Sequence, residues 1–229
     1  MLILNIETSS DVGSVNVSKD GHCWILREEK ENADHARLLT VYIEEVLKTL
    51  SLGLNDLDAV AVSEGPGSYT GLRIGVSVVK GICYTLQKPL IAVDTLKAMA
   101  YGVQLMDKPG QKDVIVSIQD ARRMDAYAAV YSSNLETLKA PFFLTLEPDS
   151  FLEMIPKGGR IFVCGNASEK WSRLVNNSSV IFSSVNCPSS RFMEKISFDL
   201  YREQKFENCA YFEPFYMKPP NVTLPKNLI

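Results

Sequence analysis

The sequence is poor in the residues that build metal centres and disulfide frameworks. It contains 2 histidines, His22 and His35, and 5 cysteines, none of them in a C-x-x-C pair. An odd number of scattered cysteines is typical of reduced thiols in a cytosol and argues against a disulfide framework. No carboxylates stand at a ligand spacing from either histidine. We therefore expect no metal site, and a cytoplasmic protein.

Long apolar runs and concentrated charge are also missing. No apolar stretch approaches the ~18 residues of a membrane span, and the N-terminal segment lacks the basic region of a signal peptide. The net charge is −3, and Lys and Arg cluster only in short pairs such as Arg122-Arg123. Because nucleic-acid affinity comes largely from phosphate neutralisation, the chain alone is a poor candidate for a nucleic-acid binder. We expect no contact with a membrane.

Alternating and periodic apolar segments predict a duplicated α/β architecture. Hydrophobic residues make up 46% of the 229 residues and charged residues 22%, which is enough apolar material for a buried core. Each half begins with three predicted strands and continues with mixed helices and strands. We expect strands at 2–7, 13–18, 22–29, 57–63, 90–95, 113–123, 125–132, 140–146, 160–166 and 179–184, and helices at 34–50, 68–86, 167–175 and 190–204.

The segment Ser63–Gly81 contains the glycine-rich stretch G-P-G-S-Y-T-G ahead of a predicted helix. Backbone N–H groups at such a place can hold an anion. A Walker A loop, however, ends in Lys followed by Ser or Thr, and here Leu72 follows Gly71. The spacing of Gly65, Gly67 and Gly71 is one residue too wide for the dinucleotide fingerprint. We therefore expect a tight turn that begins a helix, and no phosphate.

The two predicted helices of the first half carry more apolar surface than one buried face requires. Gly71 and Gly75 are four residues apart, so they share a helix face and let another backbone approach closely. A central core helix is one interpretation; a helical-bundle interface with a partner is the other. In the second case Val79→Asp is expected to weaken the complex and leave the monomer folded. The predicted interface comprises Leu38, Leu39, Tyr42, Ile43, Val46, Gly71, Leu72, Gly75, Val78, Val79 and Ile82.

Six stretches carry recognisable motifs: "LNIETSSDVGSVNV", "ADHARLL", "GPGSYTGLRIGVSVVKGI", "QDARRMDAYAAVY", "VCGNA" and "EPFYMKPP". They resemble the TsaB (YeaZ) family, the dimerisation subunits of the bacterial machinery that makes N6-threonylcarbamoyladenosine in tRNA. The resemblance spans nearly the whole chain, and its most specific part is the glycine-rich segment.

The resemblance implies two half domains of the actin-like, Hsp70-like (ribonuclease H-like) fold. We expect the first at 1–100, joined by the C-terminal segment at about 206–229, and the second at 101–205. It also implies a heterodimer with the catalytic paralogue TsaD through helices matching 34–50 and 68–86. An accessory ATPase, TsaE, would join through the complex, whose substrate is tRNA. When alone, the chain is expected to form a homodimer through the same helices.

Catalytic relatives carry H-x-x-x-H on the first helix to hold a metal. Here the matching residues are His35 and Leu39, and a leucine cannot coordinate a metal. The resemblance therefore implies a scaffold with no activity of its own. The alternatives are an actin-fold nucleotide-binding kinase or ATPase and, less favoured, a metallopeptidase of the M22 glycoprotease type.

Nucleotide sites of the wider fold imply a matching, vestigial site in this chain. Its residues would be Glu7, Thr8, Ser9, Ser10, Asp120 and Gly165. Ala121 and Ala167 stand where the fold uses glycine, and their side chains would crowd a phosphate or a base. We expect no cofactor, and weak ATP or ADP binding stays open.

Overall fold

The chain folds around two five-stranded mixed sheets that repeat one strand order. The computed structural model describes residues 1–30 and 35–217. The first sheet has the order β3-β2-β1-β4-β5 and the second the order β10-β9-β6-β7-β8. In each, three antiparallel strands are followed by parallel ones. The predicted duplication and the two-sheet α/β fold class are confirmed.

The strands lie close to their predicted positions. The first sheet comprises β1 (Leu2–Glu7), β2 (Val12–Lys19), β3 (His22–Lys30), β4 (Ala59–Gly65) and β5 (Leu90–Asp94). The second comprises β6 (Val114–Asp120), β7 (Asp125–Ser132), β8 (Thr137–Thr145), β9 (Ile161–Cys164) and β10 (Val180–Phe182).

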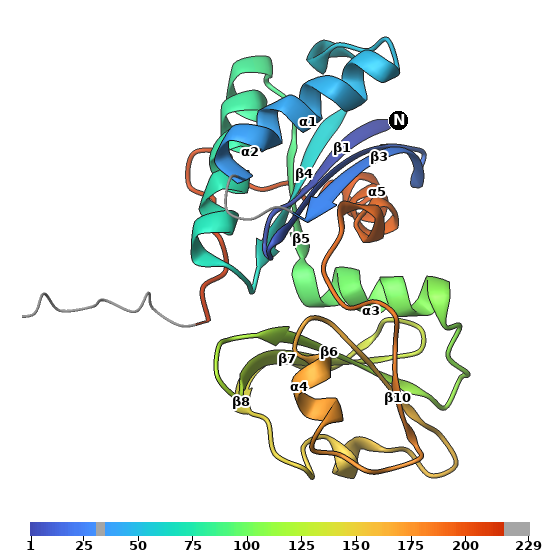
Figure 1. The fold of residues 1–229 in the computed structure, drawn as a ribbon. Helices are drawn as coiled ribbons and strands as arrows, with labels where there is room; N and C mark the ends of the chain where they lie inside the picture. The colour runs from blue at the N-terminus through green and yellow to red at the C-terminus, as the bar shows by residue number, and fades with distance from the viewer. Residues whose placement is uncertain (31–34, 218–229) are drawn as a thin grey trace, which may run out of the picture.

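Helices cover both faces of the first sheet (Figure 1). On one face, α1 (His35–Thr49) and α2 (Tyr69–Leu86) pack on alternate side chains such as Leu4 and Ile6. On the other lie α3 (Thr95–Met106) and α5 (Glu194–Arg202). The short α4 (Ser168–Ser172) packs Trp171 against the second sheet. Residue 34, at which the first helix is predicted to begin, lies outside the described residues.

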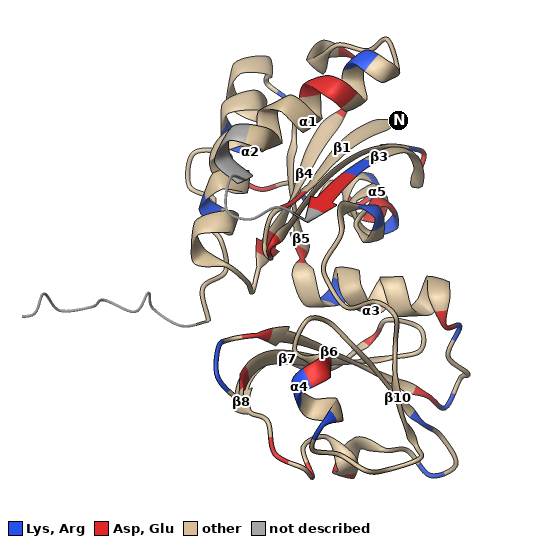
Figure 2. Ribbon diagram, viewed as in Figure 1, with Lys and Arg blue, Asp and Glu red and all other residues tan. Residues whose placement is uncertain are grey.

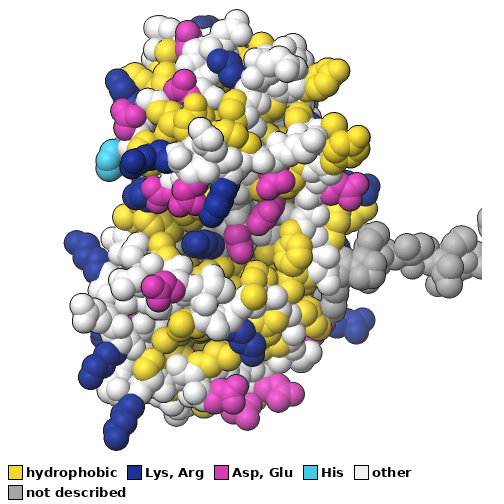
Figure 3. All heavy atoms as spheres, turned by 180° about the vertical axis from the view of Figure 1, so that it is seen from behind, with side chains coloured by type: hydrophobic (Ala, Val, Ile, Leu, Met, Phe, Trp, Pro, Cys, Tyr) yellow, Lys and Arg dark blue, Asp and Glu magenta, His cyan; other side chains and the backbone are white. Residues whose placement is uncertain are grey.

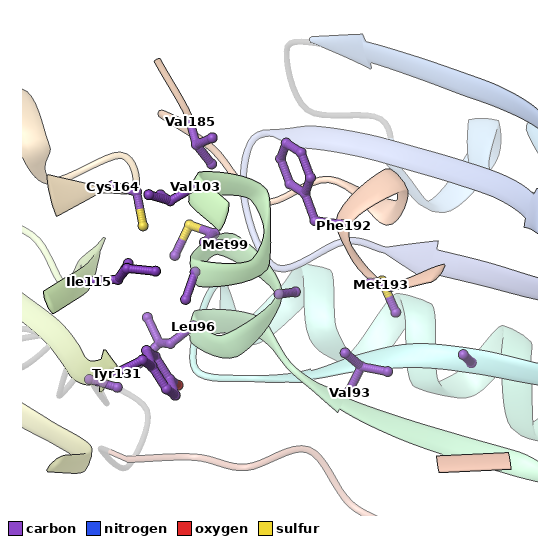
Figure 4. Close-up of a cluster of buried hydrophobic side chains, with 14 of the residues drawn as sticks. Val93, Leu96, Met99, Val103, Ile115, Tyr131, Cys164, Val185, Phe192 and Met193 are labelled. Carbon is purple, nitrogen blue, oxygen red and sulfur yellow. The ribbon is translucent and has the colours of Figure 1, made fainter. Parts of the chain in front are cut away.

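Helix α3, which is not among the predicted helices, joins the two sheets into one core. Figure 1 shows it between the sheets, and Figure 4 shows Leu96, Met99 and Val103 directed toward side chains of the second sheet. Asp94 begins the helix, because its Oδ1 accepts hydrogen bonds from the N–H groups of Leu96 (2.7 Å) and Lys97 (3.1 Å). The predicted set of helices is therefore corrected by adding α3, whose N-cap and apolar helical period are both present in the sequence.

After the second sheet, the chain returns to the first. Ser190 already contacts β2, since its N–H donates to Ser14 Oγ (2.8 Å) and its carbonyl accepts from Asn16 Nδ2 (2.8 Å). Ser197 of α5 donates to Asn5 Oδ1 at 2.6 Å. We propose that the first half takes back the chain from about residue 190, earlier than the expected 206. Among residues 1–30 and 35–217, no helix has the length and apolar character to cross a membrane.

Candidate protein interface between helices α1 and α2

Helix α1 uses most of its apolar residues inside its own chain. Leu39, Tyr42, Ile43 and Val46 are all at most 5% exposed and pack on the first sheet. Leu38 is only partly buried, and Val41 on the outer face is 41% exposed. The predicted excess of apolar surface is therefore present, but it is smaller than the sequence pattern suggested.

Helix α2 is a core helix along one face and an open helix along the other. Ser68 begins it by accepting a hydrogen bond from Gly71 N–H at 3.3 Å. Leu72 and Val79 are fully buried, whereas Val78 and Ile82 are partly exposed. Figure 2 shows how few charged residues this helix carries; within Tyr69–Leu86 they are Arg73 and Lys80.

Burial inside the chain corrects much of the predicted contact list. Val79 is at 0% exposure, so Val79→Asp would place a charge in the core, and the expectation that this monomer stays folded is wrong. Apart from Ile43, which also lines the groove described below, the buried side chains of that list have almost no surface to offer a partner while the fold is intact. The buried residues are Leu39, Tyr42, Ile43, Val46, Gly71, Leu72, Gly75 and Val79; those still partly exposed are Leu38, Val78 and Ile82.

Gly71 and Gly75 allow a close backbone approach, but the backbone is the chain's own. A Cβ atom at Gly71 would lie 2.0 Å from the carbonyl oxygen of Thr8, and one at Gly75 would lie 2.4 Å from Thr8 Oγ1. Both glycines thus seat α2 on the turn between β1 and β2. This corrects the prediction that they face a partner.

An apolar groove runs between α1 and α2. Its volume is about 910 Å³, and its walls include Ile43 and Leu47 from α1 and Val78 and Ile82 from α2. Gly81 lies at the same groove, is exposed, and would have nothing within 4 Å of an added Cβ atom. A glycine within a helix costs ~1 kcal/mol relative to alanine, and no contact in the described chain explains this one.

The C-terminal segment covers the opposite flank of α2. Lys80 Nζ donates to the carbonyls of Ala210 (3.0 Å) and Phe212 (3.1 Å), and Arg73 Nε donates to the hydroxyl of Tyr216 (3.2 Å). Tyr84, one turn after Lys80, is 71% exposed. The open face of α2 is therefore bounded by the groove on one side and by the C-terminal segment on the other.

This segment passes an acidic group with an unusual pKa. Phe215 N–H donates to the carbonyl of Glu64 at 2.7 Å, and Glu207 N–H donates to Leu90 O at 2.9 Å. Burial, together with the smaller effect of the nearby carboxylates of Asp94 and Glu207, raises the pKa of Glu64 to about 7. Glu64 therefore titrates near neutral pH in the folded chain.

Glu64→Gln is expected to reduce the pH dependence of stability. Between pH 4.5 and 7 the unfolded chain ionises Glu64 while the folded chain keeps it protonated, so wild-type stability falls as pH rises. One pKa unit corresponds to ~1.4 kcal/mol, which bounds the loss at about 3 kcal/mol; partial exposure makes about 2 kcal/mol the expectation. Urea unfolding at pH 5 and pH 8.5 measures it. Parallel pH profiles for the two proteins would refute the assignment to Glu64.

The turn after β1, predicted as a vestigial phosphate loop, has its backbone occupied. Ser9 N–H donates to Glu7 Oε1 (2.5 Å), and Thr8 N–H donates to Ser63 Oγ (3.4 Å). Ser9 O accepts from Ser68 N–H (2.7 Å) and from Gln119 Nε2 (2.9 Å). Burial raises the pKa of Glu7, and hydrogen bonds from Ser9 oppose that shift. The N–H groups of Thr8 and Ser9 therefore both have partners inside the chain.

The remaining predicted nucleotide residues are only partly brought together. Ser10 and Gly165 line one cavity of about 590 Å³ between the two sheets. Asp120 is paired with Lys170 at 2.7 Å and accepts from Arg122 N–H at 2.5 Å. Its carboxylate thus already forms an ion pair with a side chain of this protein.

A family model described as "TsaD: tRNA N6-adenosine threonylcarbamoyltransferase" matches residues 29–196. The chain belongs to this family. The matched range includes α1, α2 and the groove between them. It therefore covers the candidate interface, strands β4 and β5 of the first sheet and the whole second sheet.

Relatives that match over nearly the whole chain carry the name TsaB. The tRNA threonylcarbamoyladenosine biosynthesis protein TsaB of Escherichia coli K12 is 28% identical, over 95% of this chain and 95% of its own. TsaB of Haemophilus influenzae is 25% identical, over 95% and 94%. A transferase of the family from Staphylococcus haemolyticus is 34% identical, but over 45% of this chain and 35% of its own. The resemblance to TsaB is confirmed.

Solved structures confirm the fold. YeaZ from Pseudomonas aeruginosa superposes with a TM-score of 0.82 at 21% identity, over 94% of this chain and 99% of that one. The activator of 2-hydroxyisocaproyl-CoA dehydratase from Clostridium difficile, with bound ADPNP, has a TM-score of 0.53 at 11% identity, over 91% and 99%. The similarity to the dehydratase activator shows the actin-like fold class, and its bound ADPNP says nothing about ligands of this chain.

Proposed function

We propose that this chain is a non-catalytic subunit of the tRNA threonylcarbamoyladenosine machinery and binds the catalytic paralogue TsaD through the groove between α1 and α2. The observation that carries the proposal is the end-to-end match to TsaB proteins, which covers the helix pair. The groove adds a physical reason, because its apolar walls would gain from being covered.

The absence of an own active site is part of the proposal. Leu39, at the position where catalytic relatives place a second metal-binding histidine, is 3% exposed and belongs to the core. Among the residues that the structure describes, no cluster of three or more His, Cys, Asp or Glu could hold a metal. The side chain of His35 is outside that description. These points favour a supporting subunit over a transferase or a metallopeptidase.

The arrangement around the vestigial nucleotide residues supports the same choice over a kinase or ATPase. Such an enzyme would need Glu7 and Asp120 to hold Mg-nucleotide. Burial disfavours the charged form of Glu7, and Asp120 is paired with Lys170. We therefore propose that ATP is bound elsewhere in the complex, by TsaE. As a subunit of tRNA-modification machinery, this chain is proposed to act in the cytoplasm.

Substrate tRNA is proposed to belong to the complex as a whole. Figure 3 shows Lys and Arg interspersed with Asp and Glu on one face of the molecule, with hydrophobic side chains between them. A surface of mixed sign provides little of the phosphate neutralisation on which RNA affinity depends.

In the absence of TsaD, the groove between α1 and α2 is proposed to pair two copies of this chain.

Reconstitution of the modification tests the proposal. TsaD, TsaE, tRNA and the threonylcarbamoyl donor are combined with and without this chain, and modified nucleoside is quantified. We expect modification to fall at least tenfold without the chain, and the chain without TsaD to yield none. Product formed by the chain alone would contradict the scaffold role, and unchanged TsaD activity in its absence would contradict the functional link.

A further inference from the structure

One glycine of α2 has no role inside the described chain. Gly71 and Gly75 must be glycine because Thr8 packs against both of them. An added Cβ would lie 2.0 Å from an atom of Thr8 at Gly71 and 2.4 Å from one at Gly75. Gly81 is exposed and would meet nothing within 4 Å. We propose that Gly81 is the point at which a helix of the partner subunit comes closest to α2, and that it determines which partner fits the groove. The inference rests on the proposed heterodimer.

The surroundings of Gly81 fit a helix as the occupant. Ser77 lies one turn before it and also lines the groove, while Val78 and Ile82 lie beside it and are half-buried. Small residues between larger apolar ones make a depression into which the ridge of another helix packs. Since the distance between helix axes depends on the side chains at the contact, a missing Cβ at the groove lets the axes approach further.

The rim of the groove does not select a partner by net charge. Glu44 and Lys48, both exposed on α1, line it with one charge of each sign. Shape at the apolar floor is then the main source of selectivity. The proposed occupant of the groove is a helix of TsaD, a chain of the same family. The family model of the transferase spans both α1 and α2 and therefore predicts an equivalent helix pair on TsaD.

Gly81→Ala separates the needs of the chain from those of the partner. Alanine favours a helix over glycine, so the melting temperature of the isolated chain is expected to rise by about 2 °C. The dissociation constant with TsaD, measured by titration calorimetry, is expected to rise at least tenfold. Ser77→Ala is the matched control, since it also favours the helix but adds no atom; its affinity is expected to stay within about twofold of wild type.

The outcomes are distinguishable from a failure of the proposed function. If wild type binds TsaD and Gly81→Ala binds equally well, the role of Gly81 is refuted and the heterodimer stands. If wild type does not bind TsaD, both fail. A lower melting temperature for Gly81→Ala would show that the chain itself needs the glycine. Loss of self-association alone, seen by sedimentation with TsaD binding unchanged, would make a second copy the occupant and refute the commitment to TsaD.

Discussion

Val79→Asp is expected to prevent the chain from folding. Val78→Asp, one residue away, is expected to fold but no longer to bind TsaD. Val79 is at 0% exposure among apolar side chains of the first sheet, and burying an unpaired carboxylate costs several kcal/mol. That is a large part of the 5–15 kcal/mol by which most domains are stable. Val78 lines the groove and is partly exposed, so its carboxylate can reach water in the free chain.

The measurements are circular dichroism melting of each variant and size-exclusion chromatography with TsaD. For Val78→Asp we expect a loss of about 1 kcal/mol in the free energy of unfolding and no co-elution with TsaD. Val41→Asp, the same substitution on the outer face of α1 and outside the groove lining, is the control for the added charge. A Val78→Asp protein that still co-elutes with TsaD would move the interface away from the groove. A Val79→Asp protein with a normal melting curve would contradict the described core.

Gly71→Ala is expected to be among the most damaging single-methyl changes in the chain. The added Cβ would lie 2.0 Å from the carbonyl oxygen of Thr8, so helix α2 and the turn after β1 would have to separate. Overpacking of this kind costs about 3 kcal/mol. The same change at Gly81, where an added Cβ would meet nothing within 4 Å, is expected to stabilise the free chain.

Comparison of the two variants in urea unfolding measures the difference directly. We expect the midpoint to move down for Gly71→Ala and up for Gly81→Ala, with similar slopes. Since both replace a helical glycine with alanine, helix propensity cancels and only the surroundings differ. Equal midpoints would mean that Thr8 yields without cost, and that the glycine-rich segment is not required for seating α2.

Much of the fold was predictable because the elements carry local signals. Alternation in β1 and β2 and the apolar period of α2 follow from residues close together in sequence. Helix α3 was not predicted, although Asp94 caps it directly after β5 and its buried residues recur with a helical period. The contacts of the C-terminal segment with Lys80 and Arg73 join residues more than a hundred positions apart, and no local pattern encodes them.

The candidate interface divides in the same way. The sequence by itself determined that α1 and α2 would be unusually apolar and that the glycine-rich segment lacks a phosphate-binding lysine, since these depend on residue type and spacing alone. The family resemblance adds the expectation that Leu39 stands in place of a metal ligand. Only the tertiary structure decided which apolar residues stay open. Val78 and Val79 look alike in the pattern, but the sheet covers one and leaves the other at the groove. Likewise Thr8 packs against Gly71 and Gly75, whereas nothing in the described chain lies close to Gly81. Which segment contacts each glycine depends on what the fold brings near it from elsewhere in the sequence.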